Sequence, residues 1–172
     1  MKSISKILIL VLFSLSVDAQ QNNLDSLLKA LKKADSDLLR YQVNTELYFH
    51  YEETNRDSAL YYIEELLSLA KNNNQTLAYA EALSDKGYQL TQKGRYAEAL
   101  KCLYESLPIA SDPQNEKNSW PSSLNYTPAK ARLSLVARTE QFIGYLMSHT
   151  QNHEQALVHL NNVKRIALVN GD

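Results

Sequence analysis

The sequence predicts an all-α fold in which three repeated helix pairs stack as an α-α superhelix. Its 172 residues include only four glycines and four prolines, and every proline lies between Pro108 and Pro128, so long stretches lack helix breakers. An Ala-Leu pair recurs at Ala59, Ala99 and Ala156, each time among apolar residues at helical spacing. The length suits one domain, or several repeats stacked into one.

The first 19 residues have the pattern of a secretory signal peptide. Lys2 and Lys6 precede an apolar run over residues 7–17 that is short for a membrane span, and small residues follow up to Ala19. We therefore expect residues 1–19 to be removed on export, which places the protein in the periplasm or cell envelope. An uncleaved membrane anchor is the alternative.

The charge of the remaining chain gives no electrostatic support for binding nucleic acid. Without residues 1–19, which hold two lysines and one aspartate, 16 basic and 18 acidic residues remain, a net charge of −2 with no basic block. Cys102 is the only cysteine, so no disulfide can form within the chain, and stability must come from packing.

Residues 20–36 are expected to form a capping helix ahead of the repeats. Apolar residues at Leu24, Leu27, Leu28 and Leu31 fall on one face of a helix. We expect this face to cover the open side of the first repeat.

Aligning the repeats on their alanines reveals further shared positions. Apolar residues recur four and ten positions after each alanine, and another alanine recurs after eleven, all on one face of a helix with 3.6 residues per turn. These residues, and Leu157 beside Ala156, are expected in the core. The shared positions are Ile63, Leu103 and Leu160, then Leu69, Ile109 and Ile166, then Ala70, Ala110 and Ala167.

A second amphipathic stretch precedes these alanines and completes each helix pair. Gly87 and Gly144 lie twelve residues before Ala99 and Ala156. A glycine inside a helix costs about 1 kcal/mol relative to alanine, and close helix packing is the natural compensation. Gly94 is expected to close the turn of the middle pair. The predicted units are about 37–72, 77–111 and 129–170, within an array over 37–172.

The pattern resembles the tetratricopeptide repeat (TPR) over residues 37–170. In the middle unit, small, turn and aromatic positions of the family are occupied by Gly87, Gly94, Tyr96, Ala99 and Ser106. The resemblance implies that Tyr96 wedges between the two helices and that Ala99 marks their close crossing, with Arg95 and Glu98 in solvent. The flanking units depart from the pattern, so wider crossings are expected there. The departures are Leu47, Thr54, Arg56 and Leu66 in the first unit and Gln151, His153 and Val163 in the third.

Residues 111–128 are expected to form a loop insertion between the second and third units. The segment is rich in Pro, Asn and Ser and holds Trp120, the only tryptophan. Trp120 is expected to pack back onto the helices. The alternative is that the loop covers or contributes to a binding surface.

The sequence offers no candidate active site, metal site or cofactor motif, so we expect a protein that is not an enzyme. His149, His153 and His159 cluster in sequence, but a turn between the first two breaks the spacing of a metal site and favours a solvated turn. Cys102 lies on an apolar helix without an evident activating partner, as expected for a structural thiol.

In TPR proteins the first helix of each unit lines a concave groove that usually binds a peptide segment. The resemblance places Tyr48, Tyr88 and Tyr145 in this groove, where they would give rigid aromatic contact area. The alternative is that they fill space between successive first helices. The family's carboxylate clamp has Asn where this chain has Tyr, and Lys where it has Asn44, Ser84 and Gln141, so chaperone tails are not expected as partners. Flanking groove positions are Asn44, Tyr51, Ser84, Thr91, Gln141 and Ser148.

The resemblance implies a non-catalytic protein-protein interaction module. It is similar to the exported N-terminal TPR region of bacterial membrane sensors and regulators with histidine kinase or DNA-binding output. The signal peptide, the degenerate repeats and an uncapped last repeat favour part of such a larger protein in a Gram-negative envelope. The alternative is a free-standing periplasmic scaffold whose last repeat is covered by a second copy.

Overall fold

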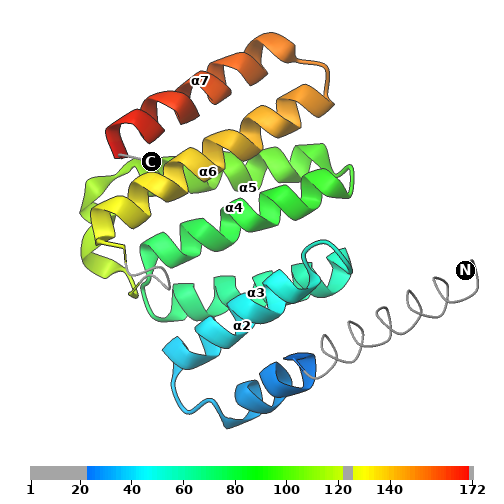
Figure 1. The fold of residues 1–172 in the computed structure, drawn as a ribbon, viewed down its shortest axis with the longest axis vertical. Coiled ribbons are helices and arrows are strands. Elements are labelled where there is room, and N and C mark those ends of the chain that lie inside the picture. The colour runs from blue at the N-terminus through cyan, green and yellow to red at the C-terminus, as the bar shows by residue number, and fades with distance from the viewer. Residues whose placement is uncertain (1–22, 122–125, 171–172) are drawn as a thin grey trace, which may run out of the picture.

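The computed structural model is a stack of helix pairs that follow one another in chain order along the long axis (Figure 1). It describes residues 23–121 and 126–170. The expected signal peptide, residues 1–19, lies outside the described residues.

The predicted fold class, an all-α array of sequential helix pairs, is confirmed. Residues 23–33 form a helix ahead of the array, and a short 3₁₀ helix, η1 (Pro113–Asn118), follows the second pair. The pairs are α2 (Asp37–Tyr51) with α3 (Arg56–Asn72), α4 (Thr76–Gln92) with α5 (Tyr96–Ser111), and α6 (Pro128–His149) with α7 (His153–Asn170).

Side-chain caps fix where three of these helices begin. Ser36 accepts a hydrogen bond from the Leu39 amide at 3.3 Å ahead of α2, and Asn55 accepts one from Ser58 at 3.1 Å ahead of α3. Thr127 caps α6, and the proline that follows it occupies a first-turn position where its missing N–H costs nothing.

The turns of the second and third pairs have the same geometry although only one contains glycine. Gly94 has a φ of 71° and Gln151 a φ of 61°, both in the left-handed region. In each turn the next amide reaches back to the preceding helix, from Arg95 to the Leu90 carbonyl at 2.9 Å and from Asn152 to the Met147 carbonyl at 2.8 Å. Gln151 therefore takes the turn position of Gly94 despite the steric cost to a residue with a Cβ.

The close crossing predicted for the middle pair is present. A Cβ on Gly87 would lie 2.5 Å from the Leu103 Cγ and 3.2 Å from the Ala99 carbonyl oxygen. At Gly144 the nearest atom, the Cγ of Leu160, would be 3.2 Å away. The middle pair thus has the tighter crossing, and α5 approaches α4 only because residue 87 has no side chain.

The core follows the alanine alignment through the first two units. Ala59, Ile63, Ala99 and Leu103 are fully buried, and Tyr96 packs half-buried against them. Ser106, at the late small position of the middle unit, is buried too, and its hydroxyl donates to the Ala80 carbonyl at 2.7 Å.

The expectation that Leu157 packs in the core is wrong. Leu157 is 62% exposed and Leu160 is 45% exposed, although Ala156 between α6 and α7 is buried. Among the described helices the backbone of α7 comes close only to that of α6, so the outer side of α7 has no neighbouring helix. Leu168 and Val169 near its end are also exposed. Over the described part of the chain, no helix combines the length and apolar character needed to cross a bilayer.

Trp120, which follows η1, packs back onto the helices as expected. Trp120 is half-buried and packs against Tyr41 of α2, with ring centroids 4.9 Å apart. The buried Tyr41 hydroxyl donates to the Ala78 carbonyl on α4 at 3.2 Å. The Trp120 side chain therefore lies near the start of the first helices of units one and two.

Candidate functional site

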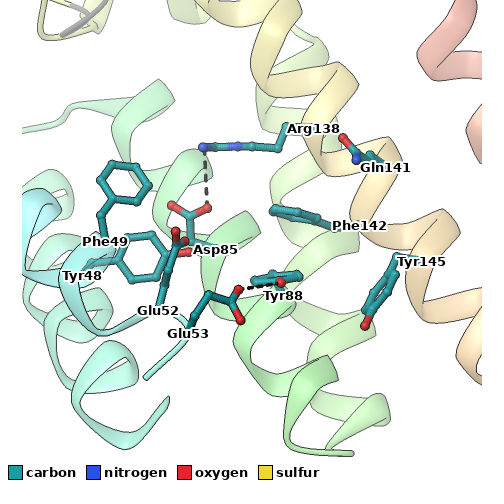
Figure 2. Close-up of a pocket in the computed structure, with 10 residues that line it drawn as sticks. All are labelled: Tyr48, Phe49, Glu52, Glu53, Asp85, Tyr88, Arg138, Gln141, Phe142 and Tyr145. Atoms are coloured by element: carbon teal, nitrogen blue, oxygen red, sulfur yellow. Dashed lines mark hydrogen bonds and ion pairs between the residues drawn. The ribbon is translucent and has the colours of Figure 1, made fainter. Parts of the chain in front are cut away.

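A cavity of about 480 Å³ lies between the first helices of all three units (Figure 2). Within residues 23–121 and 126–170, the backbone of α2 comes close to α3 but not to α4 or α6, which leaves room for this space. The lining residues are Tyr48, Phe49, Glu52 and Glu53 at the end of α2, Asp85 and Tyr88 on α4, and Arg138, Gln141, Phe142 and Tyr145 on α6.

Aromatic rings form one wall of the cavity. Tyr88 stacks on Phe142 with centroids 4.7 Å apart and an interplanar angle of 24°, and Tyr145 lies 6.2 Å from Tyr88. Gln92 donates to the Tyr145 hydroxyl at 3.1 Å, which fixes that ring against α4. Tyr88, Phe142 and Tyr145 are all only partly buried, so they offer contact area to a bound molecule.

A partly buried cluster of charged side chains forms the opposite end of the cavity. In Figure 2 the Arg138 side chain extends from α6 toward Asp85 on α4. Its guanidinium donates to Glu81 at 2.8 Å, whereas its nearest approach to the Asp85 carboxylate is 3.7 Å, an ion pair without a hydrogen bond. The Arg138 Nε is buried without a hydrogen-bond partner among the described residues.

Burial outweighs the neighbouring charges in setting the pKa of Asp85, whereas the neighbouring charges outweigh burial in setting that of Arg138. Burial raises the pKa of Asp85 from 3.8 to about 7, because desolvation outweighs the attraction of the Arg138 guanidinium, and the nearby Glu81 and Glu52 carboxylates add to the rise. For Arg138, burial alone would lower the pKa, but the carboxylates of Asp85 and Glu81 raise it above its ordinary value. Arg138 therefore stays charged, while Asp85 is poised between its two forms near neutral pH.

Two further carboxylates, those of Glu52 and Glu53, lie at the rim of the cavity. Glu53 accepts a hydrogen bond from the Tyr88 hydroxyl at 3.0 Å and pairs with Arg56 at 3.1 Å. Burial and the bond to Glu53 raise the pKa of Tyr88. Burial also raises the pKa of Glu52 and of Tyr48. The lining side chains thus comprise three carboxylates and one guanidinium.

Four of the nine sequence-predicted groove residues line the cavity, and the other five do not. Tyr48, Tyr88, Tyr145 and Gln141 line the cavity, although Tyr48 is only 2% exposed. The others lie elsewhere: Asn44, Ser84 and Thr91 are buried among the helices, Tyr51 stacks on Tyr62 of α3, and Ser148 is exposed outside the cavity.

The sequence reasoning missed the charged residues and both phenylalanines of the lining. That reasoning selected as groove residues only the positions four before and three after each groove tyrosine. Asp85 and Phe142 lie three before Tyr88 and Tyr145, and Arg138 lies seven before Tyr145, positions that share the same helix face. Searching these spacings would have found three of the six missed residues. Glu52 lies four after Tyr48 and so carries a similar signal, whereas Phe49 and Glu53, one and five after Tyr48, do not.

The histidine interpretation needs one correction. His149 and His153 are exposed around the α6–α7 turn, as expected, but His159 is not solvated. Its Nδ1 lies 2.6 Å from a buried Glu140 oxygen, and Asn162 donates to the other oxygen at 3.1 Å. No group of three or more potential metal-binding side chains occurs in the regions that the structure describes.

A second cavity, of about 530 Å³, lies between α3, α4 and α5. Its lining includes three glutamates and three lysines, so its charges balance. Cys102 is also part of this lining, and burial raises the pKa of its thiol, which keeps it protonated. The cavity between α2, α4 and α6 differs in having unbalanced negative charge beside open aromatic faces.

Sequential helix pairs, a close Gly–Ala crossing and a cavity on the first helices define a tetratricopeptide repeat protein. The family model described as the SusR N-terminal TPR domain matches residues 15–118, more than half of the chain. The chain therefore belongs to the family of SusR N-terminal TPR domains. No curated protein and no solved structure matches it.

Proposed function

We propose that this protein is a non-catalytic interaction module whose cavity between α2, α4 and α6 binds a segment of a partner protein. The observation that carries the proposal is the set of partly exposed aromatic faces, Tyr88, Phe142 and Tyr145, which two different repeats bring together in one cavity. Such rings give large contact area at low entropic cost, and they are enriched among residues that dominate binding energy. TPR domains are typically non-catalytic, which agrees with this assignment.

Site-specific crosslinking in the native host tests the proposal. A photo-crosslinking amino acid at Gln141, which is exposed and lines the cavity, should give a discrete adduct. The same group at Tyr104, exposed on α5 away from the cavity, should not. Adding Tyr88→Ala should weaken the partner complex by about 1–3 kcal/mol and reduce the Gln141 adduct.

Circular dichroism separates a binding role of Tyr88 from a packing role. Retained helicity with a lost adduct supports partner binding. Equal adducts at Gln141 and Tyr104, or an adduct that Tyr88→Ala leaves unchanged, would show that this cavity is not the binding surface.

We also propose that the domain is the extracytoplasmic part of a larger membrane signal-transduction protein. The apolar side chains exposed on α7, Leu157, Leu160 and Leu168, support this, since each repeat of a TPR array normally covers the apolar side of its neighbour. The signal-peptide pattern of residues 1–19 and the description of the family as an N-terminal domain agree with it. A free-standing scaffold with a second copy against α7 is the competing arrangement.

The intact mass of the native protein in envelope fractions distinguishes the two arrangements. We expect a detergent-requiring species far above 19.6 kDa, the mass of the 172 residues. A detergent-free species slightly below that mass would contradict the proposal and favour the scaffold.

A further inference from the structure

We propose that the cavity between α2, α4 and α6 binds a basic side chain, arginine or lysine, of the partner segment. This inference rests on the proposed function, since it names the chemistry that the binding surface selects. Three features carry it: unbalanced negative charge, a buried carboxylate without a hydrogen bond, and aromatic faces beside it.

The charge around the cavity is negative even when every ion-pair partner is counted. The lining carries three carboxylates against one guanidinium. Adding Glu81, which pairs with Arg138, and Arg56, which pairs with Glu53, gives four against two. The formal net charge is −2 in both counts with Asp85 ionised and −1 with Asp85 protonated, so the surroundings of the cavity stay negative. The low dielectric of a partly closed site strengthens its attraction for a cation.

Asp85 provides the specific anchor. Its side chain is 7% exposed and lines the cavity, yet no described residue donates a hydrogen bond to it, and Arg138 approaches only to 3.7 Å. A buried carboxylate in this state is costly unless it gains a hydrogen-bonded cation. An incoming guanidinium or ammonium group supplies that cation and favours the ionised form of Asp85. Glu52, half-buried at the same end of the cavity, offers a second carboxylate.

The aromatic wall suits the same ligand. Stacked Tyr88 and Phe142, with Tyr145 beside them, present ring faces next to the carboxylates. A cation over an aromatic face is attracted by the ring quadrupole, and arginine also stacks through its planar guanidinium. An acidic ligand would meet repulsion from Glu52, Glu53 and Asp85, because Arg138 is already engaged by Glu81. A purely apolar ligand would leave these carboxylates desolvated and unpaired.

A titration of the purified chain with two matched small probes tests the inference. Nα-acetyl-argininamide carries the positive charge, and Nα-acetyl-citrullinamide has nearly the same shape without it. We expect NMR shifts of Tyr88, Phe142 and Tyr145 to saturate with the arginine probe, with at least tenfold weaker binding of the citrulline probe. Nα-acetyl-lysinamide should bind as well. Equal binding of the arginine and citrulline probes, or no shifts with either, would overturn the inference.

Charge-removing variants show whether the named carboxylates are responsible. Glu52→Gln keeps the size of the side chain and should weaken the arginine probe about five- to tenfold, and Asp85→Asn should do the same. Glu46→Gln, exposed on α2 outside the lining, is the matched control and should have no effect. Because Glu52 is only half-buried, its variant is expected to fold, which circular dichroism checks. An equal loss in Glu46→Gln, or unchanged binding in Glu52→Gln and Asp85→Asn, would contradict the assignment.

The crosslinking experiment separates failure of this inference from failure of the proposed function. A Gln141 adduct together with no selective arginine binding would refute basic-side-chain recognition and leave the interaction module in place. Selective arginine binding without a Gln141 adduct would support the cation site and refute its use for a partner protein.

Discussion

Leu103→Ala should lower the free energy of unfolding by about 3 kcal/mol. Leu103 is fully buried on α5, and its side chain fills the space opposite Gly87 on α4. Truncation removes buried apolar contacts and leaves a cavity that rigid helices close only in part. Chemical denaturation with urea, with an unchanged m-value, measures the loss.

The same contact makes a sharper prediction for Gly87. Gly87→Ala should cost about 1–2 kcal/mol, because a Cβ 2.5 Å from the Leu103 Cγ overpacks the crossing by more than the helix gains from alanine. In the double variant the clash with the leucine disappears, only the 3.2 Å contact with the Ala99 carbonyl oxygen remains, and the new methyl group fills part of the cavity. We therefore expect the double variant to be at least 1 kcal/mol more stable than the sum of the single losses predicts.

The third unit provides the control for this double-mutant cycle of Gly87 and Leu103. At Gly144 the Leu160 Cγ is 3.2 Å from the added Cβ position, and Leu160 is 45% exposed, so it can move aside. Gly144→Ala with Leu160→Ala should show little coupling. Additive losses at Gly87 and Leu103 would mean that the α4–α5 crossing shifts freely, contrary to a close crossing fixed by glycine.

The sequence predicted the helix pairs because helical periodicity records which face of a helix is apolar. It also located the crossing at Gly87 and Ala99, because small residues inside apolar helices allow two helices to pack closely. It failed at Leu157 because periodicity does not say whether a neighbour covers that face. Leu103 and Leu160 occupy equivalent positions in the repeat alignment. Leu103 is fully buried, whereas Leu160 on α7 is 45% exposed because no described helix lies outside α7.

The candidate site was predicted only in part for a related reason. Register within one helix places Tyr88 and Tyr145 on the faces of α4 and α6 that line the cavity. However, the pairing of Arg138 on α6 with Glu81 and Asp85 on α4 depends on how far apart the helices lie. The spacing of α2 from α4, which opens the cavity, is a tertiary property without a signal in any single helix.

Asp85→Asn should make the protein more stable, and the gain should increase with pH. The groups that act on Asp85 are Glu52 at the end of α2, Glu81 on its own helix and Arg138 on α6, and Tyr41 and Tyr48 of α2 interact with it electrostatically. Burial raises the folded-state pKa of Asp85 to about 7, above its ordinary value of 3.8. Between these values the folded protein binds the proton more tightly than the unfolded chain does. The stabilisation that comes from binding this proton is therefore complete below the ordinary pKa of Asp85, and it is lost as pH rises toward the folded-state pKa.

Urea unfolding of the parent and the variant at pH 5 and pH 8 measures this effect. The advantage of Asp85→Asn should grow by about 2 kcal/mol between these pH values, within an upper limit of roughly 4 kcal/mol for the whole shift. Asp35→Asn, at an exposed position outside the cluster, reports the effect of removing one formal charge. An advantage that does not grow with pH would mean that Arg138 neutralises Asp85 fully. The cavity would then hold no buried carboxylate awaiting a cation. If the advantage grows as expected, and Asp85→Asn also loses the arginine probe, the chain carries at Asp85 a charge that weakens the fold and serves binding.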